Sequence, residues 1–217
     1  MKFCGITRLE DAEAAVEAGA WALGVILWPG SPRACDPAEA ARIARTFKRR
    51  VEVAGVFVNA PLDEVAQNVD ALGLTMVQLH GSEGPSFCGE VARRTGARVI
   101  KAARVRARAD VQALEPFHTD FHLYDAYKDG RWGGTGETFD WELSRLRQTN
   151  IPLILSGGLH AGNVGEAIAA VRPYAVDVAS GTEAAPGIKD PERIAAFASA
   201  VEEADAAARP AAPQESA

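Results

Sequence analysis

Short apolar runs rich in β-formers alternate with stretches in which apolar residues have helical spacing, and this alternation constrains the fold most. Such alternation is typical of parallel β-α units, which are joined by right-handed crossovers. There are eight runs: Met1–Cys4, Leu23–Leu27, Val53–Val58, Met76–His80, Val99–Ala102, Phe121–Asp125, Leu153–Ser156 and Ala175–Ala179. Since eight units of this size close into a (β/α)8 barrel at a lower limit of about 200 residues, we predict an α/β fold with a lean TIM barrel.

The stretches between the runs predict the helices that cover this barrel. They are Arg8–Glu17, Pro37–Phe47, Pro61–Ala71, Ser86–Arg94, Trp141–Arg147, Asn163–Val171 and Pro191–Glu203, with a weaker helix over Ala109–Leu114. A doubly wound open sheet is the competing architecture, but the chain contains neither G-x-G-x-x-G after the first run nor G-x-x-x-x-G-K-[ST]. We expect one barrel domain over residues 1–205, followed by a disordered tail of small residues and prolines over residues 206–217.

Composition bears mainly on the partners and the location of the protein. Lys and Arg number 23 against 29 Asp and Glu, giving a net charge of −6 without a dense basic block, so we expect no nucleic-acid or membrane partner. No stretch reaches the roughly 20 apolar residues of a membrane span. Because no apolar leader precedes the first run, we expect a cytoplasmic protein.

The cysteines and histidines do not form a metal-binding pattern. Cys4, Cys35 and Cys88 are odd in number and lack C-x-x-C spacing, so we expect free thiols rather than disulfides or a structural zinc site. His118 and His122 have i, i+4 spacing, but the segment between them enters a strand rather than a helix. We therefore predict no metal.

The first and sixth runs end in a candidate base and a candidate acid, at the barrel end where active sites form. Cys4 ends the first run, where it is either a small buried hydrophobe or, as a thiolate, a general base. Asp125 ends the sixth run, where it is a helix cap, an ion-pair partner or a proton-donating acid. Cys4 and Asp125 thus form a candidate base and acid.

Glycine-rich turns follow the sixth, seventh and eighth runs, and they include Gly133, Gly134, Gly157, Gly158, Ser180 and Gly181. Such turns are often only structural, but the loops after strands seven and eight of a barrel commonly bind phosphate through backbone N–H groups. We therefore expect a small phosphorylated substrate.

Three further polar residues are placed to contact a substrate. Arg33 follows the stiff Pro32 after the second run and could bind a planar carboxylate, although a solvated arginine is the ordinary alternative. His80 ends the fourth run, as a substrate contact or a structural histidine. Asp177 lies inside the apolar eighth run, so it faces either the barrel mouth or a buried partner.

The chain resembles the phosphoribosylanthranilate isomerase family of tryptophan biosynthesis, and the matching motifs extend from residue 2 to about residue 197. The motifs are Lys2-Phe3-Cys4-Gly5-Ile6-Thr7, Ser31-Pro32-Arg33, Gly55-Val56-Phe57-Val58-Asn59, Val77-Gln78-Leu79-His80-Gly81, Gly133-Gly134-Thr135-Gly136-Glu137-Thr138-Phe139-Asp140-Trp141, Ser156-Gly157-Gly158-Leu159 and Val176-Asp177-Val178-Ala179-Ser180-Gly181-Thr182-Glu183. One departure is Ser156, where the family usually has alanine.

The resemblance implies an Amadori rearrangement of a phosphoribosyl aminoaldose to an aminodeoxyketose phosphate. It implies that Asp125 is the general acid, that Cys4 is the general base, that Arg33 holds the anthranilate carboxylate and that the glycine turns hold phosphate. No metal or redox cofactor is implied, because the iminium intermediate is itself the electron sink.

Two other functions remain as alternatives. A related barrel isomerase acts on the aminoaldose of histidine biosynthesis, but it has aspartate on its first strand where this chain has Cys4. A barrel that binds a phosphoribosyl ligand without catalysis would tolerate loss of Asp125. We expect either a monomer or a homodimer.

Overall fold

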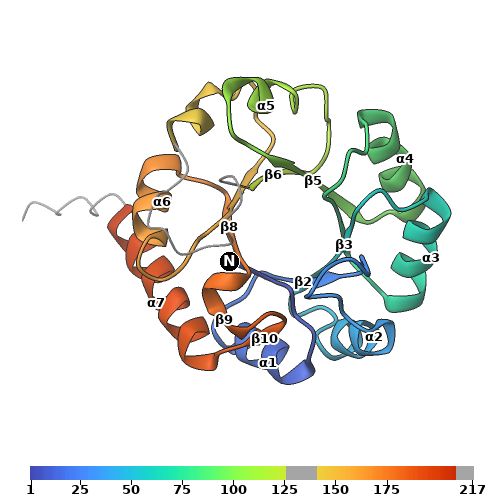
Figure 1. Cartoon of the computed structure of the whole chain (residues 1–217), viewed down its shortest axis with the longest axis horizontal. Helices are drawn as coiled ribbons and strands as arrows, with labels where there is room; N and C mark the ends of the chain where they lie inside the picture. The colour runs from blue at the N-terminus through green and yellow to red at the C-terminus, as the bar shows by residue number, and fades with distance from the viewer. Residues whose placement is uncertain (126–140, 209–217) are drawn as a thin grey trace, which may run out of the picture.

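Eight parallel strands pair in chain order and close on themselves in the computed structural model, which describes residues 1–125 and 141–208. The strands are β1 (Lys2–Cys4), β2 (Ala22–Ile26), β3 (Glu52–Phe57), β4 (Met76–Leu79), β5 (Arg98–Arg104), β6 (Phe121–Asp125), β7 (Leu153–Ser156) and β8 (Ala175–Val178). Pairing of β1 with β8 completes the barrel, and Figure 1 shows helices around its outside. The predicted α/β barrel is confirmed, and each of the eight runs contains its strand or most of it.

Strand alternation divides the apolar side chains between two cores. The side chains inside the barrel include Ala54, Met76, Ile100, Leu123 and Ile154, all fully buried. Their strand neighbours point outward and pack beneath the helices in a second, larger cluster. Because side chains alternate between the two faces of a strand, the period of each run decides which residues can reach the barrel interior.

The helices on the outside cover the larger cluster. They are α1 (Leu9–Glu17), α2 (Pro37–Thr46), α3 (Leu62–Leu72), α4 (Pro85–Thr95), α5 (Arg108–Gln112), α6 (Val164–Val171) and α7 (Pro191–Ala208). At the start of α2, the Asp36 carboxylate accepts hydrogen bonds from the backbone N–H groups of Ala38 and Glu39. This cap and Pro37 in the first turn explain why the helix begins there.

One predicted helix type and one predicted helix end were wrong. The stretch expected to be a helix over Trp141–Arg147 is a 3-10 helix, η1 (Trp141–Leu146). Helix α7 continues to Ala208, three residues into the expected tail, because Ala206, Ala207 and Ala208 favour helix. Residues 209–217 lie outside the described residues.

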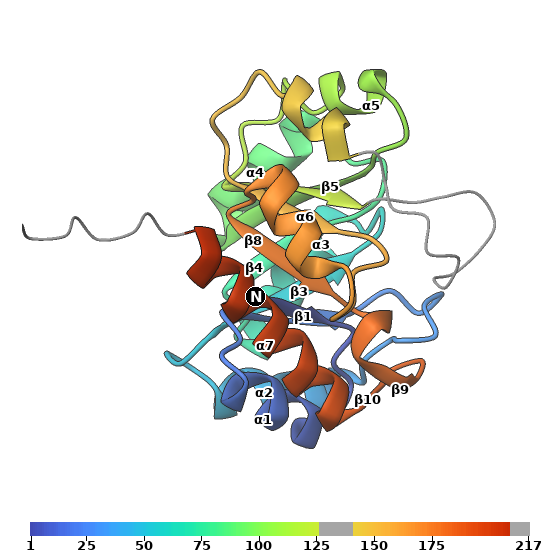
Figure 2. The same ribbon diagram turned by 90° about the vertical axis from the view of Figure 1, so that its left-hand side faces the viewer.

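A short hairpin after β8 was not predicted. A 3-10 turn, η2 (Ser180–Thr182), leads into β9 (Glu183–Ala185), which pairs antiparallel with β10 (Ile188–Lys189). Figure 2 shows this hairpin near the beginning of α7, and Figure 1 shows it beside α1. Within residues 1–125 and 141–208, no helix is long and apolar enough to cross a bilayer.

Helix α7 is anchored to the barrel by an aromatic pair. Phe3 on β1 and Phe197 on α7 are both fully buried, and their ring centroids lie 6.0 Å apart in an edge-to-face arrangement. Phe197→Ala should lower the free energy of unfolding by about 3–5 kcal/mol, because it leaves a cavity in this core. Urea denaturation would measure the loss.

Glu202→Ala is the matched control, because Glu202 is exposed on the same helix. It should change the free energy of unfolding by no more than about 0.5 kcal/mol. A similar loss in both variants would contradict the role given to the aromatic pair.

Candidate active site

The carboxyl ends of the barrel strands bring the predicted acid–base residues to one mouth. Cys4 ends β1 with its side chain inside the barrel, because the intervening Phe3 packs outward against α7. Asp125 ends β6, which is separated from β1 by β7 and β8 in the closed order. Cys4 is only 6% exposed, whereas the Asp125 side chain is 27% exposed. The base candidate is thus enclosed, while the acid candidate is open to a ligand.

The surroundings of Cys4 are charged although it is buried. Burial raises the pKa of the Cys4 thiol, and the nearby Asp177 carboxylate raises it further. The ammonium groups of Lys2 and Lys189 oppose both effects. Opposite charges favour the thiolate over the neutral thiol, so the two lysines offset part of the rise in the pKa of Cys4.

His80 lies beside Asp125. The Nε2 atom of His80 is 3.4 Å from Oδ2 of Asp125, and its Nδ1 atom is 3.2 Å from Nε2 of Gln78. Gln78 is 1% exposed and fixes the imidazole from inside the barrel. The structure therefore places His80 next to the candidate acid, as a contact at the mouth.

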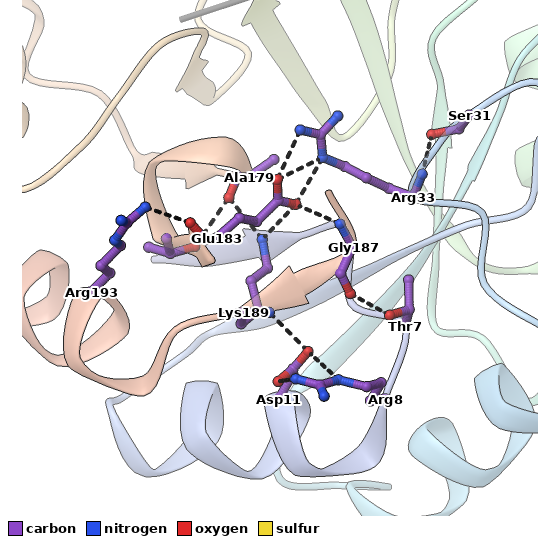
Figure 3. A network of polar contacts seen from close by, with 11 residues as sticks. Thr7, Arg8, Asp11, Ser31, Arg33, Ala179, Glu183, Gly187, Lys189 and Arg193 are labelled. Atoms are coloured by element: carbon purple, nitrogen blue, oxygen red, sulfur yellow. Dashed lines mark hydrogen bonds and ion pairs between the residues drawn. The ribbon is translucent and has the colours of Figure 1, made fainter. Parts of the chain in front are cut away.

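Arg33 is held in a bidentate ion pair. Its Nε and Nη2 atoms donate to the Glu183 carboxylate at 2.8 Å, with a further contact of 3.1 Å from Nε (Figure 3). Glu183 also accepts hydrogen bonds from the backbone N–H of Gly187 and from Lys189. This pair fixes the plane of the guanidinium, so the structure positions Arg33 through a residue to which sequence analysis gave no role.

The β9–β10 hairpin that carries Glu183 and Lys189 is itself tied to α1 and to the loop before it. The Lys189 backbone N–H donates to Asp11 at 3.1 Å, and the Thr7 hydroxyl donates to the carbonyl of Gly187 (Figure 3). Gly187 has a φ of +78°, a conformation that glycine adopts readily. The Pro186-Gly187 dipeptide is a recognisable turn signal, and it could have revealed the hairpin.

Two of the three predicted phosphate turns lie against each other. Gly157 and Gly158 after β7 have φ values of 96° and 66°, which suit glycine. After β8, a Cβ atom on Gly181 would lie 2.0 Å from the carbonyl oxygen of Leu159, so only glycine allows this approach. Ser180 begins the same turn. Gly133 and Gly134 of the third turn lie outside the described residues.

Asp177 has buried partners within the barrel. Its Oδ1 atom is 2.8 Å from Nζ of Lys2, and its Oδ2 atom accepts a hydrogen bond of 3.1 Å from the Ser156 hydroxyl. The sequence left open whether Asp177 faces the barrel mouth or a buried partner. In the structure it contacts a buried partner, Lys2. Among residues 1–125 and 141–208, no group of three or more His, Cys, Asp or Glu side chains could hold a metal ion.

Comparison with known proteins gives a consistent family. The model of the family described as N-(5'-phosphoribosyl)anthranilate (PRA) isomerase matches residues 1–200. The chain is 50% identical over 194 residues to the N-(5'-phosphoribosyl)anthranilate isomerase of Citrifermentans bemidjiense, covering 89% of this chain and 92% of that protein.

Solved structures agree with the sequence comparison. The phosphoribosyl anthranilate isomerase of Thermotoga maritima has a TM-score of 0.84 and 40% identity, covering 93% of this chain and 98% of that one. A phosphoribosyl anthranilate isomerase in complex with reduced 1-(o-carboxyphenylamino)-1-deoxyribulose 5-phosphate has a TM-score of 0.81 and 39% identity. That match covers 93% of this chain and 97% of the other.

The Arg33–Glu183 pair should make stability depend on acid pH. Burial alone would raise the pKa of Glu183, but the hydrogen bonds from Arg33 and the charge of Lys189 outweigh it and lower the pKa below the ordinary 4.5. The pair therefore stabilises the fold above pH 4.5, and this contribution is lost as the pH falls through the lower folded-state pKa. Glu183→Gln should be less stable than the unmodified chain at pH 7, and the difference should shrink towards pH 3.

Urea denaturation at pH values from 7 to 3 would measure this difference. Glu192→Gln, an exposed glutamate at the start of α7, is the matched control and should show no such pH-dependent gap. A gap for Glu183→Gln that stayed constant down to pH 3 would contradict the ionic role of the pair.

Proposed function

The chain belongs to the N-(5'-phosphoribosyl)anthranilate isomerase family, and from this membership we infer that it catalyses the corresponding step of tryptophan biosynthesis. The reaction is the Amadori rearrangement of N-(5-phosphoribosyl)anthranilate to 1-(2-carboxyphenylamino)-1-deoxyribulose 5-phosphate. The observation that carries this function is the family match over residues 1–200, combined with a cysteine and an aspartate at the mouth of the matching barrel.

We propose that Asp125 is the general acid. Opening of the furanose ring needs a proton on the ring oxygen. The bond from this oxygen to C1 breaks, and the lone pair of the anthranilate nitrogen forms a double bond to C1, which gives an iminium ion. The Asp125 carboxyl group is partly exposed at the end of β6, so it can reach a ligand at the mouth. His80, 3.4 Å from Asp125, is proposed as a further substrate contact that also orients the acid.

We propose that Cys4 is the general base. Once the ring is open, the proton on C2 is acidified by the iminium group, and its removal leaves an enolamine that becomes the ketone product. A cysteine thiolate is a suitable base for this step, because it can accept one proton and is itself strongly basic toward an acidified C–H group. The position of Cys4 at the end of β1, with the ammonium groups of Lys2 and Lys189 nearby, supports this assignment.

The remaining substrate groups have matching partners around the mouth. We propose that the Arg33 guanidinium, whose plane Glu183 fixes, binds the anthranilate carboxylate. The packed turns at Gly157, Gly158, Ser180 and Gly181 are proposed to bind the phosphate through backbone N–H groups. The sequence proposal that Asp177 contacts the substrate has less support, since both of its oxygens already have partners.

The reaction needs no cofactor on chemical grounds, because it moves hydrogen within one molecule and leaves its overall oxidation state unchanged. We also propose a cytoplasmic location. Its support is that Cys4, Cys35 and Cys88 are all free thiols, as is usual in a reducing compartment.

The test is the loss of anthranilate-type fluorescence when the protein meets phosphoribosylanthranilate made in situ from anthranilate and phosphoribosyl pyrophosphate. A rate above spontaneous hydrolysis, with formation of the deoxyribulose phosphate, is expected for the unmodified chain. Asp125→Asn and Cys4→Ala should each lower kcat at least about a hundredfold, because each removes a proton-transfer group.

Cys88→Ala is the control for Cys4→Ala, because Cys88 is a buried free thiol on α4. It should retain kcat close to that of the unmodified chain. If the protein instead accelerated isomerisation of the aminoaldose of histidine biosynthesis, this result would favour the related isomerase. Binding of a phosphoribosyl ligand that Asp125→Asn leaves intact, without any turnover, would favour a binding module.

A further inference from the structure

A fully buried lysine lies inside the barrel at the strand that carries Cys4. Lys2 is 0% exposed, and β1 pairs with β8 so that Lys2 is in register with Asp177. Its Nζ atom is 2.8 Å from Oδ1 of Asp177, whose Oδ2 atom accepts a hydrogen bond from Ser156 on β7. Three strands thus fix one ammonium group in the barrel interior.

The ammonium group of Lys2 and the thiol of Cys4 face the same space. The two residues are two positions apart on β1, so their side chains leave the strand on the same side. A methyl group on Gly24 of β2 would lie 2.8 Å from Sγ of Cys4 and 3.2 Å from Nζ of Lys2. Both groups therefore rest against one glycine, which leaves room for them to meet.

We propose that Lys2, held in place by Asp177 and Ser156, is a positioning residue that stabilises the thiolate of Cys4 during proton abstraction. This inference rests on the proposed role of Cys4 as the base. It gives Asp177 a role other than substrate binding, because the ion pair with Asp177 holds the Lys2 ammonium group inside the barrel on the same side of β1 as Cys4.

The charges around Cys4 fit this role. Within residues 1–125 and 141–208, the charged groups that face its thiol are Lys2 on β1, Asp177 on β8 and Lys189 on β10, while Gly24 on β2 brings no side chain. Lys2 favours the thiolate both by its charge and by a hydrogen bond, and Lys189 acts by charge alone. Lys189 also donates to Glu183 and to the carbonyl of Ala179, whereas Lys2 donates to Asp177.

Lys2 keeps its proton throughout the proposed step. Burial alone would lower the pKa of Lys2, but the charge of Asp177 and the interaction with Cys4 outweigh it and raise the pKa above 10.5. The C2 proton passes to Sγ, and the electrons of the broken C–H bond neutralise the iminium. The thiolate charge disappears as the thiol forms, and no proton is exchanged with the ammonium.

A purely structural role for the Lys2–Asp177 pair explains less of the arrangement. A buried ion pair is weak support for stability, because the cost of removing both ions from water offsets much of their attraction. Apolar side chains of similar size could fill the same volume. Because the pair lies beside the buried thiol of Cys4, the positive charge of Lys2 can stabilise the thiolate.

The experiment follows the rate at which iodoacetamide alkylates Cys4 as a function of pH, with mass spectrometry of the peptide that contains Cys4. Lys2→Met keeps an unbranched side chain, one atom shorter than that of lysine, and removes the charge. It should move the midpoint of the alkylation profile at least about one pH unit higher and lower kcat at neutral pH about tenfold. Burial raises the pKa of Cys35 to about 12 and that of Cys88 to about 11, and the peptide readout separates both from Cys4.

Lys101→Met is the matched control, because Lys101 is also a buried lysine in an ion pair, with Glu83 at 2.8 Å. It does not face Cys4 and should leave the Cys4 alkylation midpoint unchanged. An equal midpoint for Lys2→Met and the unmodified chain would overturn the proposal. So would an equal shift in Lys101→Met, since it would show a general effect of loosening the barrel.

If Lys2→Met fails to fold because Asp177 is left as an unpaired buried charge, the variant Lys2→Met/Asp177→Asn removes both charges. Its Cys4 midpoint should still lie above that of the unmodified chain. The reason is that Lys2 lowers the pKa of the thiol more than Asp177 raises it. A midpoint at or below the original value would overturn the proposal. The alkylation readout uses no substrate, so it separates this inference from the base assignment, which fails if Cys4→Ala retains turnover.

Discussion

The seam between β1 and β8 is the constraint on which the rest of the structure depends. A parallel barrel exists only if its last strand pairs with its first, and here the register places Lys2 opposite Asp177 and Phe3 opposite Val178. The outward pair joins the apolar layer under α7, while the inward pair places a buried charge next to Cys4. Closure of the fold and construction of the site are therefore one event at this seam.

The period of the runs made the fold predictable. Each strand keeps its register because alternate side chains fill two separate cores. In the run Leu153–Ser156, for example, Leu153 and Leu155 join the outer cluster and Ile154 joins the barrel interior, so an unbroken apolar run is what the fold requires. The boundaries that were wrong lay where the period is weak. A short amphipathic segment at Trp141 can form either a 3-10 or an α-helix, and the alanines before Arg209 continue a helix that the apolar pattern does not require.

The candidate site was predictable to the extent that strand ends determine it. The sequence could place Cys4 and Asp125 at the same mouth, because each ends a strand and the carboxyl ends of barrel strands lie together. Glu183 and Lys189 could not, because their importance comes from contacts across the chain: Glu183 meets Arg33, 150 residues away in sequence. For Asp177, a charged residue within an apolar run predicted a polar contact. Only the register of β1 and β8 shows that the partner is Lys2.

The hairpin of β9 and β10 has a consequence for how the barrel could be divided. It contacts the loop after β2 through Arg33 and the start of α1 through Asp11. The hairpin after the last barrel strand therefore packs against the loops that follow the first two strands. The first half of the barrel holds the proposed base and Arg33, and the second half holds the proposed acid and the packed glycine turns. Neither half-barrel contains a complete set of reacting groups, so a duplicated or separated half would need its counterpart before chemistry could occur.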